Sequence, residues 1–379
     1  MQPASIDILA GECRVYFAFE VAFSIDLARA ALRFPESARE ALPQSRRVPA
    51  DADFAQKPLR IALERAVHEI GVHEIGVHEI GVHEIGGAPP FSTAPLVEVT
   101  LYDFGAVSVS FRIPIGGSPA QLRALAAALW NNHALATAAR ACVEEVIATL
   151  GEAATRPELR GVPEDYIVFV VDPASTGGVA PSVEAFGADN LAALLQLEDQ
   201  PLSAAEIADA TANALAYGRR DLVLVDWAAA FVVDAQPAAT LAVLELANVQ
   251  LVELKHLDSE LDRGLDQVWA MANDRSLFSR FRLRANLRKL TELELEGAAL
   301  FDGVTNALKL FGDASLARVQ RAAGLRFRIE DWERSIARKL ETLGSVTERL
   351  ESRQSQYRSE LLEWIIIALI AFEIVRTFL

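Results

Sequence analysis

The sequence predicts an α+β fold: an N-terminal mixed α/β domain, then a long coiled-coil-like helical hairpin and a C-terminal transmembrane helix. Strand-like and helix-like segments alternate irregularly up to residue 236, which favours an α+β domain over a doubly wound sheet. Two heptad patterns fall within residues 237–360. Residues 361–379 are apolar over most of their length. The predicted parts are therefore 1–236, 237–360 and 361–379.

The first domain opens with a strand, a helix and a hairpin. Large apolar residues occupy the odd positions from Val15 to Ile25, which predicts a half-buried strand. A short helix over Leu27 to Leu32 follows. Leu96 to Leu101 and Ala106 to Ile115 predict a hairpin, because turn residues separate the two strand-like runs. Ser118 then caps an alanine-rich helix.

The rest of this domain repeats the same kinds of element. Tyr166 to Val171 predicts a buried strand. Ser203 begins a capping-box pattern, which predicts a helix through Ala216. Leu222 to Val225 and Phe231 to Val233 predict a second strand pair.

Two carboxylates at predicted strand ends, Asp172 and Asp226, are the only candidates for catalysis. The loop DPASTGG over residues 172–178 lacks the lysine of a P-loop, so it predicts a plain turn. No nucleophile, second acid or basic partner is near either aspartate in the sequence. We therefore predict no catalytic residue and no cofactor. The alternative is an enzyme of unknown reaction with a site near Asp172 and Asp226.

Residues 67–86 are four copies of VHEIG, which place four histidines five positions apart. The histidines are His68, His73, His78 and His83. A zinc-protease helix needs a spacing of four, and neither a helix nor a strand gathers side chains that are five apart. The array therefore predicts a tandem-duplicated surface insertion with no metal site, although nickel or zinc could bind opportunistically in vitro.

Charge and cysteine content limit the classes of function. The 379 residues carry a formal net charge of −16, which argues against broad coating of nucleic acid. Cys13 and Cys142 are too few for a disulfide framework or a four-thiolate zinc site. The N-terminal sequence shows no basic segment followed by an apolar core, so no secretory signal is predicted.

The second part contains two heptad seams. One joins leucines 244, 251 and 265 with Leu254, Leu261 and Val268. The other runs from Ile329 through Ile336, Leu343, Leu350, Tyr357 and Trp364, with Leu340, Thr347, Gln354 and Leu361 between them. We predict an antiparallel hairpin of these two helices, closed through residues 276–311.

A basic stretch lies between the two seams and has no acidic residue within it. It offers a surface for an anionic partner such as a ribosome or RNA, or else the solvated face of a helix. The residues concerned are Arg280, Arg282, Arg284, Arg288 and Lys289.

Residues 361–379 predict a membrane anchor. As a helix they span about 28 Å, against a hydrocarbon core of about 30 Å. The flanking arginines favour a position of most of the chain in the cytoplasm. The alternative is a terminal helix buried in an oligomer. The anchor residues are Trp364, Ile365, Ile366, Ile367, Leu369, Ile370, Phe372 and Arg376.

Four stretches of the sequence carry a resemblance: LYDFGAVSV at 101–109, ANVQLVELKHLDSELDRGLD at 247–266, NALKLFGDASLAR at 306–318 and LLEWIIIALIAFEIV at 361–375. They resemble the family named for the protein required for meiotic nuclear division, which has bacterial YagE-like members. The resemblance implies an α+β domain, a helical hairpin and a C-terminal membrane segment. It also implies support of translation by tethering ribosomes at a membrane. The family has no established catalytic residues.

These observations and the resemblance together predict a non-enzymatic, tail-anchored scaffold at the bacterial inner membrane, with most of its chain in the cytoplasm. Its expected partners are the membrane and either another protein or further copies of itself, bound through the helical hairpin. A contact with ribosomes or RNA through the basic stretch is a narrower prediction.

Overall fold

The computed structural model describes residues 8–40, 57–70, 91–273, 297–298 and 314–378. The chain divides into two compact units. The first unit contains residues 1–253 and 303–330, and the second contains residues 254–302 and 331–379.

An eight-stranded sheet forms the centre of the first unit, with the strand order β11-β12-β10-β1-β8-β7-β4-β3. Neighbouring strands are antiparallel except β10 and β12, which are parallel. The strands are β1 (Ile8–Glu20), β3 (Arg39–Glu40), β4 (Leu59–Glu64), β7 (Leu96–Leu101), β8 (Ala106–Gly117), β10 (Arg160–Val171), β11 (Leu222–Val225) and β12 (Ala229–Val233). Two short pairs lie outside it: β2 (Ser24–Ile25) with β9 (Ala154–Thr155), and β5 (Glu69–Ile70) with β6 (Phe91–Ser92).

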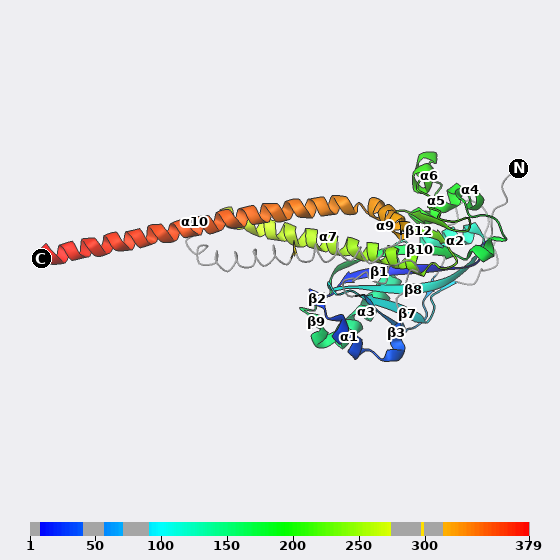
Figure 1. Ribbon diagram of the computed structural model, residues 1–379, viewed down its shortest axis with the longest axis horizontal. Coiled ribbons are helices and arrows are strands. Elements are labelled where there is room, and N and C mark those ends of the chain that lie inside the picture. The colour runs from blue at the N-terminus through cyan, green and yellow to red at the C-terminus, as the bar shows by residue number, and fades with distance from the viewer. Residues whose placement is uncertain (1–7, 41–56, 71–90, 274–296, 299–313, 379) are drawn as a thin grey trace, which may run out of the picture. The chain divides into compact units, whose positions relative to one another are not determined.

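The helices of the first unit connect and cover these strands (Figure 1). They are α1 (Leu27–Arg33), α2 (Pro119–Leu129), α3 (His133–Leu150), α4 (Val183–Phe186), α5 (Ala188–Gln196), α6 (Ala204–Thr211), the first part of α7 (Ala238–Asn273) and α9 (Ala314–Arg326). Three 3₁₀ turns, η1 (Glu36–Ala38), η2 (Gly151–Ala153) and η3 (Pro173–Thr176), lie between them.

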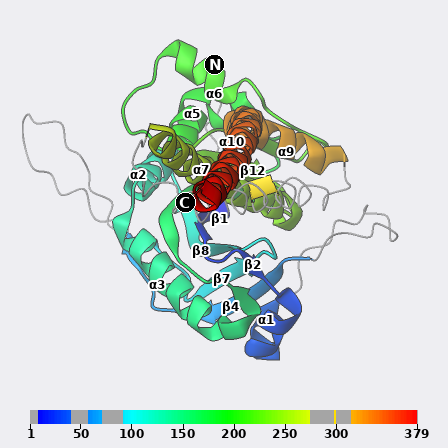
Figure 2. The same ribbon diagram turned by 90° about the vertical axis from the view of Figure 1, so that its left-hand side faces the viewer.

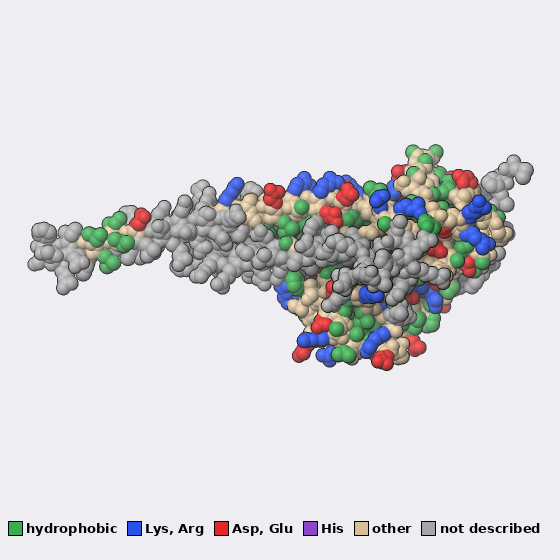
Figure 3. Space-filling model, in the orientation of Figure 1, with side chains coloured by type: hydrophobic (Ala, Val, Ile, Leu, Met, Phe, Trp, Pro, Cys, Tyr) green, Lys and Arg blue, Asp and Glu red, His purple; other side chains and the backbone are tan. Residues whose placement is uncertain are grey.

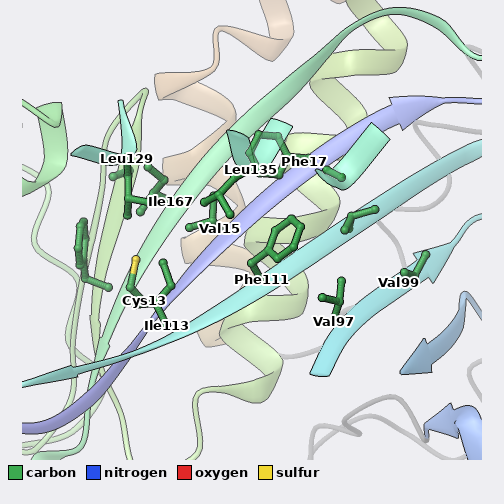
Figure 4. Close-up of a cluster of buried hydrophobic side chains, with 14 of the residues drawn as sticks. Cys13, Val15, Phe17, Val97, Val99, Phe111, Ile113, Leu129, Leu135 and Ile167 are labelled. Carbon is green, nitrogen blue, oxygen red and sulfur yellow. The ribbon is translucent and has the colours of Figure 1, made fainter. Parts of the chain in front are cut away.

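Strand β1 has two different faces because side chains alternate along it. Cys13, Val15 and Phe17 point into a large apolar core, which Figure 4 shows together with Phe111 and Leu135. Helices α2 and α3 supply side chains to this core and lie beside β8 (Figure 2). Even positions of β1 lie on the other face, where Glu12, Arg14, Tyr16 and Glu20 are charged or polar and Ala18 joins a small apolar cluster.

The first part of α7 contributes to the opposite face of the sheet. Its residues Leu246, Val249 and Val252 form a small apolar cluster with residues of β1 and the β7–β8 hairpin, including Ala18 and Tyr102. The hairpin itself is confirmed at the predicted positions.

Several local predictions are confirmed and two need correction. Ser118 forms the predicted capping box with Gln121, and the Ser203 side chain accepts the predicted bond from the Glu206 N–H. Helix α6 ends at Thr211 rather than Ala216, because Leu215 instead pairs with Val223 across a β-bridge.

The predicted strand from Val15 to Ile25 is also interrupted. Strand β1 begins earlier and ends at Glu20. The Val21 and Ala22 N–H groups both donate to the Gly105 carbonyl, which takes this stretch out of the regular ladder. Ser24 and Ile25 then pair with β9 instead.

The two helices of the second unit are parallel, so the predicted antiparallel hairpin is wrong. Helix α10 spans Ile329–Phe378. Ser335 Oγ lies 3.2 Å from Asp258 Oδ1 on α7, and Lys339 Nζ lies 2.7 Å from Asp258 Oδ1 and 2.6 Å from Asp262 Oδ1. Residue numbers therefore increase together along both helices, and both run in the same direction in Figure 1.

The parallel pair buries part of the predicted seams. Ile336 and Leu343 of α10 are fully buried, and Leu254 and Leu261 of α7 are at most 1% exposed. Gly297, in the segment that connects the helices, lies against the same seam. A Cβ atom at this position would be 3.2 Å from Leu257 Cδ1 and 3.3 Å from Leu340 Cδ2.

The predicted C-terminal transmembrane helix is wrong. Over the described residues, no helix has both the length and the apolar character needed to cross a membrane. The reason is visible in the sequence, because Glu363 and Glu373 bound the apolar run from Trp364 to Phe372. That run covers about 14 Å of helix, roughly half of a hydrocarbon core of about 30 Å.

Candidate functional site

The end of α10 presents an exposed apolar surface in the second unit. Ile366, Ile367, Leu369 and Ile370 each expose 54–61% of their area, and Figure 3 shows hydrophobic side chains gathered there beside one acidic group. Scattered exposed leucines are ordinary on a protein surface, but a contiguous group is typical of an interaction site.

The described part of helix α7 ends before it reaches this surface. Ser335 pairs with Asp258 across an offset of 77 residues. In a parallel pair that offset aligns Asn273, the last residue of α7, with Leu350 of α10. Among the described residues, no part of α7 therefore lies beside α10 beyond Leu350.

Lys339 provides the main polar contact of the helix pair. Its ammonium group contacts the carboxylates of both Asp258 and Asp262. Burial alone would lower the pKa of Lys339, but the hydrogen bonds and charges of these two aspartates raise it overall. The contact favours the parallel register because it joins one residue of α10 to two successive turns of α7.

Asp226 lies in the turn between β11 and β12 and is almost completely buried. Its Oδ1 atom accepts a hydrogen bond of 2.8 Å from the Trp227 N–H and lies 3.5 Å from Arg326 Nε. Burial raises the pKa of Asp226, although the Trp227 N–H and the Arg326 charge oppose the shift.

Arg326 connects three elements of the first unit. Besides Asp226, it contacts Asp209 on α6, with 2.6 Å between Arg326 Nη1 and Asp209 Oδ2. The Tyr166 hydroxyl donates to the Asp226 carbonyl at 3.0 Å, and its ring packs edge-on against Phe327. Asp226 thus has a basic partner after all, and this partner fastens α9 to the sheet.

Asp172 lies away from Asp226. The register pairs Ile167 with Ala229 and Val171 with Val233, so Asp226 precedes one end of this strand pair and Asp172 follows the other. Asp172 Oδ1 accepts from the Ala174 N–H at 2.8 Å and caps the η3 turn. The two carboxylates of the proposed enzyme alternative are therefore not brought together.

A charged layer lies on the polar face of the sheet. It consists of Glu12, Arg14, Arg60, Glu98 and Glu245. Arg60 contacts Glu245 on α7 at 2.6 Å and Glu98 on β7 at 3.6 Å, while Arg14 contacts Glu98 at 2.5 Å and Glu12 at 2.7 Å. Burial alone would lower the pKa of Arg60. The negative charges of Glu245 and Glu98 outweigh this effect, so the pKa is raised overall.

A second acidic group is buried farther along α7. Glu253 is 3% exposed and Glu20 of β1 is 7% exposed. Burial, and then the negative charge of Glu20, raise the pKa of Glu253 well above its usual value. Glu253 Oε1 has no hydrogen-bond partner in the part of the chain that the structure describes.

Several predicted residues fall wholly or partly outside the described residues. Arg280, Arg282, Arg284, Arg288 and Lys289 lie outside them, as do the second, third and fourth copies of VHEIG. Trp364, Ile365, Phe372 and Arg376 belong to α10, but their side chains are not described. In the first copy, the His68 N–H donates to Thr93 Oγ1 and the His68 ring packs edge-on against Phe111.

Comparison with known proteins identifies the family. Residues 10–239 match the family model described as "Uncharacterized protein MJ0711, N-terminal domain". The chain belongs to this MJ0711 N-terminal domain family. The predicted membership of the meiotic nuclear division family is therefore wrong, and the ribosome tethering that it implied loses its basis.

One curated relative of the chain is the uncharacterized protein MJ0711 of Methanocaldococcus jannaschii. It is 23% identical over 161 residues, which cover 42% of this chain and 49% of the relative. The match thus spans about half the length of the relative. No solved structure matches the chain. The relative is archaeal and no described helix crosses a membrane, so the predicted bacterial inner-membrane location is wrong.

Proposed function

We propose that this protein is a non-enzymatic scaffold that pairs with a second copy of itself through the C-terminal part of α10. The observation that carries the proposal is the exposure of Ile366, Ile367, Leu369 and Ile370 over more than half of their area. Contact with a second helix would remove this surface from water, which contributes roughly 25 cal/mol for each Å² of apolar area.

The seven-residue spacing of α10, which continues into the same stretch of the helix, favours a second copy as the occupant. Ile336 and Leu343 are buried within the helix pair, and the same seven-residue spacing continues in the sequence through Leu350 and Trp364. The described part of α7 ends level with Leu350, and we propose a second helix as the partner of the later seam positions. The same stretch of a second molecule has the matching spacing.

The separation of Asp172 and Asp226 supports a scaffold over the enzyme alternative. An acid–base pair must reach one substrate together, and these carboxylates lie at opposite ends of the β10–β12 pair.

Sedimentation equilibrium of the full chain tests the proposal. We expect a dimer for the natural protein and a monomer for Ile366→Glu/Ile370→Glu, because charges on this exposed apolar surface oppose its burial against a second helix. The matched control is Leu32→Glu/Val162→Glu, which alters two exposed apolar residues of the first unit and should leave the dimer intact. A natural protein that stays monomeric at all concentrations, or a dimer that survives the α10 substitutions, would refute the proposal.

A further inference from the structure

A pocket of about 640 Å³ lies in the first unit between helix α9 and the loop that follows α6. Its volume falls within the range of roughly 300–1,000 Å³ that is typical of small-molecule sites. Two alanines leave room within it, and the other side chains can donate or accept hydrogen bonds. Among the described residues, the lining is Ala216, Tyr217, Ser315, Ala317, Arg318 and Arg321.

The two arginines give the pocket a positive charge. Arg318 and Arg321 are one helical turn apart on α9, and both are exposed. Neither forms an ion pair with any residue that the structure describes, and the described lining contains no acid. In a chain with a net charge of −16, such a pocket selects anions. Planar guanidinium groups bind the oxygens of phosphate through paired hydrogen bonds.

The loop opposite α9 is held in a fixed conformation. Leu215 and Val223 close it with two backbone hydrogen bonds of 2.8 and 2.7 Å. Inside the loop, the Asp221 carboxylate accepts from the N–H groups of Tyr217 and Gly218. A loop fixed in this way loses little conformational entropy when a ligand binds.

Tyr217 presents an aromatic surface beside the arginines. Its side chain is 59% exposed, and the Arg318 guanidinium carbon lies 5.9 Å from the centre of its ring. The ring is too exposed to stabilise the core, but it can stack on a planar group of a ligand.

We propose that this pocket binds a small phosphate monoester with a planar body. The phosphate contacts Arg318 and Arg321, and the planar body packs against Tyr217. This inference goes beyond the proposed scaffold function, because it involves no residue of the α10 surface.

Calorimetric titration of the full chain with phenyl phosphate, inorganic phosphate and benzoate tests the site. Phenyl phosphate should bind at least tenfold more tightly than either other probe, because it alone combines a phosphate with an aromatic ring. Arg318→Ala/Arg321→Ala should weaken phenyl phosphate binding at least tenfold. Tyr217→Ser should reduce the preference for phenyl phosphate over inorganic phosphate and leave inorganic phosphate binding unchanged.

The matched control is Arg219→Ala/Arg220→Ala, which removes the same charge from exposed loop residues that do not line the pocket. It should change the affinity for phenyl phosphate less than threefold. Equal losses in both double variants would reduce the effect to general electrostatics and overturn the proposal. It is also overturned if phenyl phosphate does not bind at millimolar concentration, or if only a single-stranded RNA binds through Arg318 and Arg321.

Discussion

Two pairs of arginines in the first unit show opposite ways of using the same side chain. Arg14 and Arg60 lie under α7, and each contacts two carboxylates. Arg318 and Arg321 lie on α9 and contact none among the described residues. A buried arginine without partners would be costly, whereas an exposed one keeps its hydration. The first pair therefore belongs to the fold, and the second pair remains available to a ligand.

The largest effect expected from this comparison is that of Arg60→Met. Removal of the guanidinium leaves Glu245, whose side chain is 3% exposed, buried without its closest cation. Loss of one partner from a buried pair costs about 3–5 kcal/mol. Urea unfolding at neutral pH should show this loss as a lower transition midpoint with an unchanged slope.

The double variant Arg60→Met/Glu245→Met is the control for that experiment. Replacement of both members of a buried pair by apolar side chains is often nearly neutral, so most of the lost stability should return. If the single substitution costs less than about 1 kcal/mol, the charged layer does not depend on this pair.

Arg326→Met should have an intermediate effect of about 2–3 kcal/mol. Arg326 is partly exposed but contacts the buried carboxylate of Asp226, so its loss leaves that carboxylate without a cation. The control is Asp209→Ala, because Asp209 is 65% exposed and should cost less than about 1 kcal/mol. The same urea titration measures both variants, and equal losses would contradict the assigned role of Asp226.

The sequence predicted the local elements of the first unit better than its long-range contacts. The hairpin of β7 and β8 and the caps at Ser118 and Ser203 depend on residues only a few positions apart, and all three are present. Asp226 contacts Arg326, which lies 100 positions later in the chain, and no local pattern predicts such a pair. The charged side chains at alternate positions of β1, Glu12 and Arg14, were a signal that one face is polar.

The helical part exposes a different limit of sequence analysis. A heptad seam has the same spacing whether its partner runs parallel or antiparallel, so leucine positions alone could not determine the direction of α7 and α10. The polar contacts of Ser335 and Lys339 determine it in the structure. The transmembrane prediction relied on the apolar character of residues 361–379 and gave too little weight to Glu363 and Glu373 at the ends of the run.

Glu253 extends the comparison to a buried acid whose pKa is raised by burial and by the negative charge of Glu20. Its pKa is raised in the folded protein, above a usual value of 4.5. Folding therefore favours the protonated form of Glu253. The contribution of this group to the free energy of unfolding should be greatest below pH 4.5 and should fall as the pH rises through the pKa of the folded state. Glu253→Gln should remove this slope and stabilise the protein at neutral pH by about 1–2 kcal/mol.

Thermal unfolding across a pH series measures this effect. The free energies of unfolding of the natural protein and of Glu253→Gln should be similar near pH 4. They should differ more as the pH increases. Glu144→Gln alters an exposed glutamate of α3 and should change stability by less than about 0.5 kcal/mol. A stability difference between Glu253→Gln and the natural protein that does not vary with pH would contradict the assignment.

The smallest effect on stability should come from Arg318→Met/Arg321→Met. Both side chains are exposed and without ion pairs among the described residues, so their loss should change the free energy of unfolding by less than about 0.5 kcal/mol. Phenyl phosphate should nevertheless separate the variant from the natural protein. A ligand that binds only the folded state stabilises it by about 2.7 kcal/mol at 100 times its dissociation constant. The unfolding midpoint of the natural protein should therefore rise with phenyl phosphate while that of the variant stays constant. If the variant is instead destabilised without ligand as strongly as Arg60→Met, then Arg318 and Arg321 support the fold and the contrast between the two arginine pairs is wrong.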